Sequence, residues 1–492
     1  MRFSGKLLVG IPAKPSTGQS LAGESRFATL SRPFRRSEWG LLLAILVVVI
    51  LTALLDDRHI YWRELKAFFS GGLSPWYERI PSGVNIIRQT AYLGIFAIGA
   101  AIVIIAGGID LSSGSVIAFS GSICATFMVL LAPEAMKSAT PVGIPVIVLA
   151  IACTLVIAFL IGTFHAWLIT VVGLPPFIAT LATLVGLRSL ARAIVETVTA
   201  AAWGGRSAQI SMFDSQFRYL ATSIWIPVLL FIILAVTAWL LLSRTVVGRH
   251  LYALGGNEQA TRLSGIHTDR LKWLAYCISA LLSAIAGILY VGEQSGAYPQ
   301  TLGQGYELNA IAAAVVGGCS LQGGIGTIPG TVLGVLFLRT VIDGIAKIIK
   351  TGADVYEGMI VGSVVVVAVA LTQFREASKR GKQFFAGSMG KLTMLNLALL
   401  GVAVGALAGL NVTITVDNPF VEGAPPTRMN VATWIGVKLL KIDSMQTYLT
   451  QRFKVDSLGC YVLGACVGAA VLGIVFILHR IEKRRAHVVT KD

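Results

Sequence analysis

The chain has 492 residues, of which 55% are hydrophobic and only 13% are charged, and its formal net charge is +16. Because a soluble domain carries about 25% charged residues, this composition excludes a soluble protein and predicts an integral membrane protein. The basic residues form short clusters beside apolar runs, without a continuous basic stripe. The positive charge therefore indicates orientation in a membrane and argues against nucleic-acid binding.

The apolar runs are long enough to cross a bilayer as helices. Lipid satisfies no backbone polar group, and runs of roughly 17 to 25 apolar residues favour helices over a closed barrel. We expect an all-α, polytopic transmembrane bundle with about ten core helices and a C-terminal two-helix extension. A basic leader, residues 1–36, is expected to form a disordered cytoplasmic tail before a core over residues 37–372.

The first six spans of the core follow in chain order. The first helix is expected at 39–55, and the segment 56–83, with mixed charges and aromatic residues, is expected along the outer face. The next five spans are expected at about 86–106, 113–131, 144–172, 177–195 and 224–242. Six crossings from an inside start return the chain to the cytoplasm at Ser243, and the loop that follows is basic, as the positive-inside rule requires.

The second half of the core is less regular. A seventh helix is expected at 273–292. The segment 306–342 contains two apolar pieces joined by a Gly-rich break, which form either two helices or a re-entrant pair. A tenth span near 355–371 delivers a basic cluster to the inside.

The chain ends with an added apolar hairpin. A basic cytoplasmic linker, residues 373–391, leads to spans at about 392–410 and 458–478 within a last unit over residues 392–492. Both flanks of the hairpin are basic, so both are expected in the cytoplasm. The polar segment between the spans, residues 411–456, is expected to form an external loop or cap.

Residue patterns for catalysis or metal binding are sparse. The six cysteines lie in or beside apolar runs without paired spacing, and the six histidines form no metal-binding arrangement. The phosphate-binding pattern GxxxxGK[ST] does not occur, so the chain does not hold and hydrolyse ATP by that route. We therefore expect no catalytic residue, no metal site and no cofactor bound by this chain, which leaves transport as its function.

A short segment on the inner face, residues 258–265, has the pattern of an amphipathic helix. Glu258 and Arg262, four residues apart, can pair on one side, while Ala260 and Leu263 share the other. Gly265 can end the helix by adopting a positive φ. Such a helix is either an ordinary surface loop or a plug for a cleft in a soluble partner.

The stretch AGGIDLSSGS, residues 106–115, places one carboxylate between two apolar runs. Asp110 at the centre of a lipid-facing helix would cost about 2.5 to 3.5 kcal/mol on insertion scales, so it must face protein, water or a membrane surface. Glycines let the backbone break here, and Ser112 and Ser113 can satisfy the freed amides. The stretch is either a capped helix junction at the inner surface, which the number of crossings favours, or part of a solute path.

A second polar group, Tyr306, Glu307 and Asn309, lies at the start of an apolar half-helix. These residues either face a central passage or cap the half-helix, whose dipole favours Glu307. Phe177 follows a Pro-Pro break and is core packing unless it touches a solute ring. The candidate solute-path residues are Asp110, Ser112, Ser113, Phe177, Tyr306, Glu307 and Asn309.

Four stretches together carry a resemblance to a known family. They are NIIRQTAYLGIFAIGAAIVIIAGGIDLSSGSVIA (85–118), GLPPFIATLATLVGLRSLAR (173–192), ALGGNEQATRLSGI (253–266) and GYELNAIAAAVVGGCSLQGGIGTIPGTVLG (305–334). In this order and spacing they resemble the membrane permease subunits of bacterial ABC importers for monosaccharides, of the ribose, xylose and galactose type. The resemblance covers about residues 39–372. It departs from the family pattern at Asn309, where an Asp is common, and gives no account of the chain beyond Gln373.

The resemblance implies that the inner segment is a coupling helix that docks on a separate ABC ATPase subunit. The positions that it assigns to this role are Asn257, Glu258, Ala260, Arg262, Leu263, Ser264 and Gly265. It also implies a second permease copy in a homodimer or heterodimer, an external sugar-binding protein in the periplasm or outside the cell, and ATP and Mg²⁺ held by the ATPase. The location implied is the bacterial inner membrane, with both termini cytoplasmic.

We therefore expect the permease subunit of an ATP-driven, binding-protein-dependent monosaccharide importer. Within the same superfamily, a permease for nucleosides or branched-chain amino acids is the nearest alternative. An ion-coupled secondary transporter would need a titratable cluster at mid-membrane, for which the candidates are Asp110, Glu293, Glu307 and Asp343. A membrane scaffold, with the C-terminal hairpin as its working part, is the third alternative.

Overall fold

A computed structural model describes residues 36–348, apart from 57–58 and 71–75, and residues 387–489, apart from 412, 417–418, 420–426 and 443, with four isolated positions in between. Within these residues the chain is almost entirely helical. The expected cytoplasmic tail, the tenth span near 355–371 and most of the linker 373–391 lie outside the described residues.

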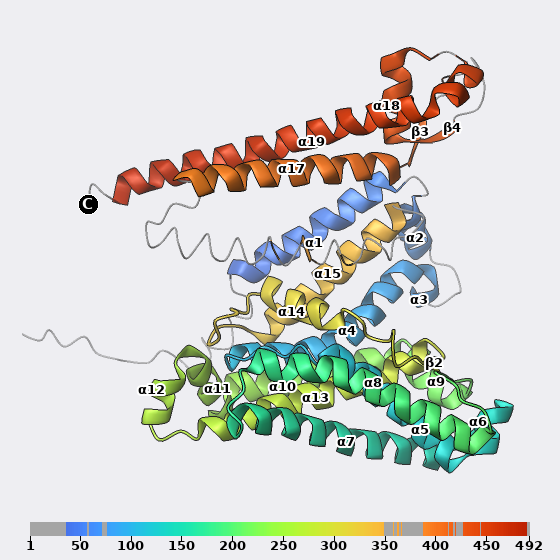
Figure 1. Cartoon of the computed structure of the whole chain (residues 1–492), viewed down its shortest axis with the longest axis vertical. Coiled ribbons are helices and arrows are strands. Elements are labelled where there is room, and N and C mark those ends of the chain that lie inside the picture. The colour runs from blue at the N-terminus through green and yellow to red at the C-terminus, as the bar shows by residue number, and fades with distance from the viewer. Residues whose placement is uncertain are drawn as a thin grey trace, which may run out of the picture.

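Nine helices among the described residues are long and apolar enough to cross a membrane. Most of them run roughly across the view in Figure 1, and they confirm the expected polytopic helical fold. They are α1 (Arg36–Leu55), α4 (Pro81–Ile105), α5 (Ser113–Leu131), α7 (Ile144–Thr170), α8 (Pro176–Trp203), α10 (Trp225–Arg244), α13 (Thr268–Glu293), α15 (Ile328–Ile348) and α19 (Met445–Val489).

The helices α4, α5 and α13 form the buried centre. Their apolar windows are 78%, 83% and 78% buried, whereas those of α7, α8 and α10 are at most 28% buried. Glycines let the central backbones approach closely: a Cβ at Gly99 would lie 2.9 Å from the Cα of Ser279, and a Cβ at Gly287 would overlap the carbonyl oxygen of Ile117. Packing at small residues is how helices associate in lipid, where hydrophobic burial between helices supplies little.

The irregular segment 306–342 contains one short helix and one full span. The half-helix α14 (Tyr306–Val316) has 11 residues, too few to cross a bilayer, and a Gly-rich turn joins it to α15. α14 packs against both α4 and α15. Gly317 and Gly330 bring its end against α15, because a Cβ on either residue would overlap the carbonyl oxygen of the other.

Short elements cover the two ends of the bundle. One end carries α2 (Ile60–Phe69), α3 (Trp76–Arg79), α6 (Pro133–Ser138), α9 (Ser215–Thr222) and an antiparallel sheet of β1 (Ile210–Ser211) and β2 (Gly296–Ala297), with Ile210 opposite Ala297. The other end carries α11 (Val246–Gly256) and α12 (Glu258–Leu263), at the left of Figure 1. Following the expected orientation, we call these the outer end and the inner end.

The C-terminal extension is a helix pair with a small cap. α17 (Gly387–Asn411) packs along α19, with a Cβ at Gly405 lying 3.0 Å from the Cα of Gly464. Between the two helices lie β3 (Thr413–Val416), β4 (Thr427–Asn430) and α18 (Val431–Leu440), and Thr413 pairs with Asn430 in an antiparallel ladder. The sequence predicted the hairpin and a cap, but it predicted neither the strands nor α18.

Several helix boundaries differ from the expectation, and α19 begins earliest relative to it, at Met445 rather than near 458. α8 ends at Trp203 rather than Val195, because Arg192 and Glu196 form an ion pair along the helix at 2.6 Å and the left-handed Gly204 terminates it. α13 begins at Thr268 rather than Trp273. Its first turn is polar and includes Asp269, which the helix dipole favours, so this turn extends beyond the apolar run.

Candidate functional site

The helix α12 lies at the inner end, between α11 and α13 (Figure 1). Asn257 caps it, because its side-chain oxygen accepts the N–H of Ala260 at 2.9 Å. The hydroxyl of Ser264 donates to the carbonyl oxygen of Ala260 at 2.9 Å, and Gly265 then turns the chain with a φ of 79°. The positive φ expected at Gly265 is confirmed.

Four charged side chains connect α12 to the start of α13. Glu258 accepts from Lys272 at 2.7 Å and from Arg262 at 3.3 Å, and Arg262 also lies 3.3 Å from Asp269. The pairing expected between Glu258 and Arg262 is confirmed as part of this network. Exposed ion pairs contribute about 0 to 1 kcal/mol each, so the network orients α12 more than it stabilises the fold.

The remaining face of α12 presents apolar side chains to the surroundings. Leu263 is 89% exposed and Ala260 is also exposed, whereas Thr261 is buried. The polar side chains therefore hold α12 in place, and the apolar side chain of Leu263 is exposed beside them. This arrangement suits the binding of a partner at the inner end.

Glycine backbones connect α11 directly to the inner end of α4. The N–H of Gly324 donates to the carbonyl oxygen of Ile105 at 2.9 Å, and a Cβ at Gly255 would overlap that oxygen. A Cβ at Gly323 would lie 2.8 Å from the Cα of Gly107. At this glycine junction (Gly107, Gly255, Gly323 and Gly324) three segments therefore meet with no side chain between them.

Asp110 lies inside the bundle and is 3% exposed. Its Oδ1 accepts the N–H and the hydroxyl of Ser112 at 2.9 and 2.6 Å, and its Oδ2 accepts the hydroxyl of Ser279 in α13 at 2.7 Å. Asp110 therefore faces protein, one of the three surroundings expected for it. After Ile105 the chain reverses at Gly107, whose φ is 84°, so the next residues re-enter the bundle before α5 begins.

The seven candidate solute-path residues do not form a single site. Ser112 and Ser113 are buried with Asp110, and the three belong to the α4–α5 break. Tyr306 begins α14, where its ring lies parallel to that of Phe96 with 6.1 Å between centroids. The other members are Asn309, which is buried in α14, Glu307, which is half-buried, and Phe177, which is 51% exposed at the inner start of α8.

The first turn of α14 touches the first turn of α5 inside the helical bundle. A Cβ at Gly114 would overlap Oε2 of Glu307, so this glycine makes room for the carboxylate. Among the residues that the structure describes, Glu307 Oε2 has no hydrogen-bond partner. Arg188 of α8 donates to the carbonyl oxygens of Gln300 and Leu302 at 3.3 and 2.8 Å.

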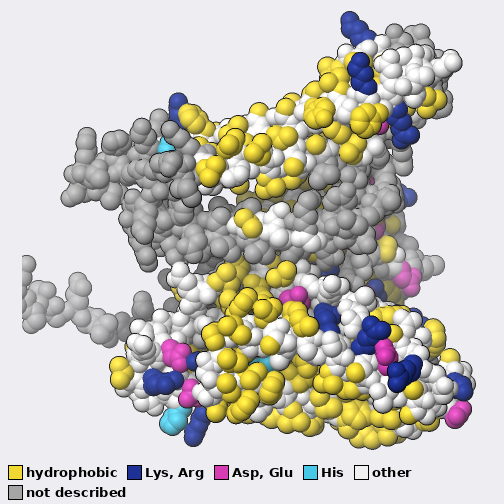
Figure 2. All heavy atoms as spheres, in the orientation of Figure 1, with side chains coloured by type: hydrophobic (Ala, Val, Ile, Leu, Met, Phe, Trp, Pro, Cys, Tyr) yellow, Lys and Arg dark blue, Asp and Glu magenta, His cyan; other side chains and the backbone are white. Residues whose placement is uncertain are grey.

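Charged residues recur every fourth position along α8, at Arg188, Arg192 and Glu196. The helix is otherwise largely apolar and only 28% buried. Figure 2 shows basic and acidic side chains gathered over the part of the molecule where Figure 1 places α8, with hydrophobic surface around them. The sequence analysis missed this charged row, although the four-residue spacing within an apolar run was the signal that could have revealed it.

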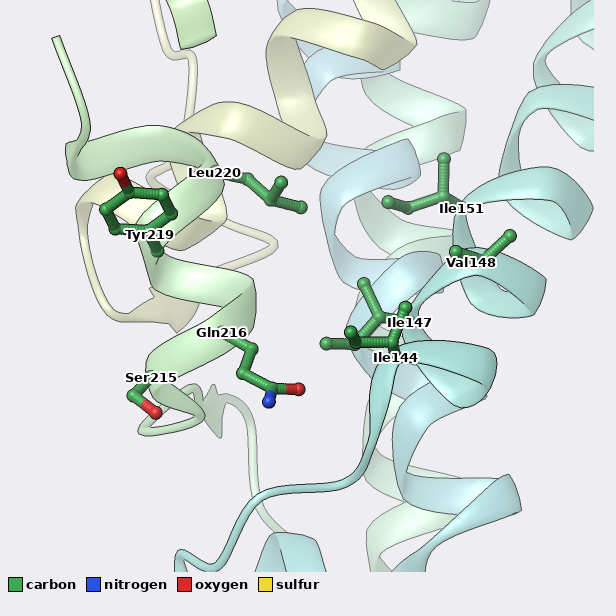
Figure 3. Close-up of a pocket in the computed structure, with 8 residues that line it drawn as sticks. All are labelled: Ile144, Ile147, Val148, Ile151, Ser215, Gln216, Tyr219 and Leu220. Atoms are coloured by element: carbon green, nitrogen blue, oxygen red, sulfur yellow. The ribbon is translucent and has the colours of Figure 1, made fainter. Parts of the chain in front are cut away.

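A cavity at the outer end, shown in Figure 3, has a different character. It has a volume of about 580 Å³ and lies between α7 and α9. Its lining residues are Ile144, Ile147, Val148, Ile151, Ser215, Gln216, Tyr219 and Leu220. None of them is charged and the α7 wall is entirely aliphatic, so this cavity offers few hydrogen bonds to a polar solute.

Residues 82–369 match the family described as the permease component of the branched-chain amino acid transport system. The chain belongs to this family. The permease is thus a multi-pass membrane protein, and the resemblance to ABC importer permeases is confirmed. The match ends before α17, so the C-terminal extension lies outside the family region.

The matches to individual relatives span most of each relative's length. The ribose import permease protein RbsC of Escherichia coli (strain K12) is 37% identical over 302 residues, which are 61% of this chain and 87% of that protein. A probable ABC transporter permease protein of Sinorhizobium fredii is 35% identical over 303 residues, 60% of this chain and 82% of that protein. The galactose/methyl galactoside import permease protein MglC of Escherichia coli (strain K12) is 31% identical over 304 residues, 60% and 87% of the two chains. No solved structure matches the permease.

Proposed function

We propose that this permease is the membrane-spanning subunit of an ATP-driven, binding-protein-dependent importer of a monosaccharide. The observation that carries the proposal is the likeness to a ribose import permease, 37% identical over 302 residues that make up 87% of that protein. The permease acts in a bacterial inner membrane with both termini cytoplasmic. It is a transport subunit and not an enzyme, because ATP and Mg²⁺ are held by a partner ATPase.

In this proposal α12 docks on the ABC ATPase. Leu263 and Ala260 are exposed for contact, and Glu258 and Arg262 orient the helix through their ion pairs with α13. Asn257, Ser264 and Gly265 fix its ends. Closure of the ATPase on ATP displaces α12, α11 carries the displacement to the glycine junction, and the solute path opens to the inner side.

The proposal also assigns a second permease copy, identical or different, and an external sugar-binding protein at the outer end. The charged row of α8 supports the second copy. Charges within a span are costly against lipid, so polar cover from water or another permease is required. A neutral polyhydroxylated solute needs a path with weak hydrogen-bonding groups, and selectivity then resides mainly in the binding protein.

Reconstitution in vesicles tests the function. The permease with its ATPase and binding protein should take up radiolabelled ribose or galactose only when ATP is present on the side of the membrane where the ATPase lies. Leucine and uridine should not be taken up. Glu258→Arg should abolish co-purification with the ATPase, whereas Glu134→Arg, a change at an exposed outer carboxylate, should not. Uptake by the permease without its ATPase would refute the proposal.

A further inference from the structure

A second cavity at the outer end lies between α1, α2 and the start of α4, and its volume is about 720 Å³. This size is within the range of about 300 to 1,000 Å³ that small-molecule sites occupy. α1 contributes Val49, Ile50 and Ala53 to its wall, and α4 contributes Gly83 and Ile86. Most of the remaining wall comes from α2, so we call it the α2 cavity.

The α2 cavity is open to the surroundings of the helical bundle. Its lining residues Ile50, Trp62, Leu65 and Phe68 are each between 42% and 48% exposed. The helix α1 forms one wall, and the apolar window of this helix is only 17% buried. A molecule that lies beside α1 can therefore enter the cavity without displacing the core.

The polar side chains of the wall already make hydrogen bonds within the protein. Tyr61 donates its hydroxyl to Asp343 of α15 at 2.8 Å, and the indole N–H of Trp62 donates to a backbone carbonyl oxygen of α1 at 3.2 Å. Of the described residues that line the cavity only Glu64 is charged, and it accepts a backbone N–H from the first turn of α4 at 3.1 Å. These bonds attach α2 to three helices, so the cavity is preformed. They also leave the wall with few groups to offer to a sugar.

The helix α2 has the pattern of a helix that lies in a membrane surface. Tyr61, Leu65 and Phe68, at spacings of four and three residues, face the cavity, whereas Arg63 and Lys66 lie on the other side and are exposed. Helices with such a division bind at the boundary between headgroups and acyl chains. Because α2 begins shortly after the outer end of α1 (Figure 1), it lies at this boundary. The cavity along its apolar face is then at the depth of the acyl chains.

We propose that the α2 cavity binds an acyl chain of a phospholipid from the leaflet at the outer end. An empty apolar cavity stays free of water and lacks dispersion contacts along its wall, and a flexible hydrocarbon chain restores these contacts. The phosphate of the same lipid is complementary to the exposed basic groups of Arg63 and Lys66. The bound chain fills the space between α1 and α4 and stabilises the outer end. The inference does not depend on which solute the permease carries.

The test counts the phospholipids that the full-length permease retains after extraction in dodecyl maltoside, by native mass spectrometry. Gly83→Phe adds a ring at a wall position where the nearest atoms to a Cβ belong to Ile80, at 3.5 to 3.9 Å. It should lower the retained phospholipid roughly tenfold, the loss expected when about two methylene groups leave an apolar site. Ile50→Trp fills the cavity from α1 and should act in the same direction. Gly40→Phe and Leu43→Trp make the same kinds of change at exposed positions of α1 outside the cavity, and both should retain as much as the wild type.

A phosphatidylglycerol with a photoreactive diazirine in its acyl chain locates the bound chain. Its label should concentrate on peptides that contain α2 and the start of α4, and Gly83→Phe should remove it from them. Arg63→Gln combined with Lys66→Gln should lower retention of this lipid roughly threefold, the contribution of exposed charge pairs. Unchanged retention in this double variant would refute the assignment of the phosphate.

Three results would overturn the inference. The first is equal retention in the cavity-filling variants and their controls, or label spread evenly over the exposed spans, because the bound lipid would then be unspecific. The second is a rise in retention when residues 392–492 are removed, because the C-terminal extension would then occupy the cavity. The third is loss of the ATPase or of a second permease from variants that keep their phospholipid, because the cavity would then be a protein-binding surface. Absence of ATP-dependent uptake would refute the proposed function alone and leave the lipid site in place.

Discussion

Replacement of Asp110 by alanine should destabilise the permease strongly. The carboxylate accepts three hydrogen bonds, from the N–H and hydroxyl of Ser112 and from the hydroxyl of Ser279. All three residues are buried. A buried donor that loses its partner costs about 1 to 3 kcal/mol, and the hydroxyl groups can rotate toward other acceptors while the backbone N–H cannot. We therefore expect a loss of about 3 kcal/mol from Asp110→Ala.

Unfolding of the purified permease by titration with sodium dodecyl sulfate measures this change. Asp110→Asn keeps one acceptor oxygen and places an amide donor against a hydroxyl group, so it should lose roughly half as much as Asp110→Ala. Glu134→Ala removes an exposed carboxylate and should change the free energy of unfolding by less than about 0.5 kcal/mol. If Asp110→Ala were as stable as the Glu134 variant, the hydrogen bonds of the carboxylate would not be what holds the α4–α5 break against α13.

Three further predictions follow from other contacts. Gly255→Ala should prevent assembly of a stable permease, because its Cβ would overlap the carbonyl oxygen of Ile105, whereas Gly256→Ala meets open space and should be recovered in normal yield on size-exclusion chromatography. Removal of residues 392–492 should leave ATP-dependent uptake largely intact, because the family match ends at residue 369, and loss of uptake would show that the extension is required. Tyr61→Phe should cost about 1 kcal/mol, because Tyr61 donates to Asp343 at 2.8 Å. Burial and this carboxylate raise the pKa of Tyr61 above its usual range. The stabilisation from this hydrogen bond is therefore fully present below the pKa that Tyr61 has in the unfolded chain, and it should stay constant from about pH 6 to 9 in unfolding titrations.

Local sequence patterns predicted the helices whose ends coincide with a change in hydropathy. α5 was expected at 113–131 and has those bounds, because Ser and Gly residues precede an unbroken apolar run. The polar ends of α8 and α13 were missed. There, ion pairs, capping and the helix dipole extend the helix beyond its apolar part, and a hydropathy pattern does not contain that information.

The same distinction applies to the candidate site. The pairing of Glu258 with Arg262 is a contact within one helical turn, and the sequence predicted it. The contact of Glu258 with Lys272 joins α12 to α13, and that of Arg188 with the carbonyl oxygen of Leu302 joins α8 to the loop before α14. One sequence does not reveal which faces of two such segments meet. The contact of Asp110 with Ser279 of α13 was not predicted for a related reason, since the number of crossings does not show that the chain turns back into the bundle after Gly107.

The glycine junction determines how the inner end can move. Side chains absorb small shifts of their neighbours by changing rotamer, but peptide groups in direct contact cannot adjust in this way. A push on α11 must therefore move the end of α4 and the turn before α15 by a similar distance in the same event. The inner end of the permease then moves as one rigid body. A displacement of α12 therefore reaches both the break between α4 and α5 and the turn between α14 and α15 without being absorbed on the way.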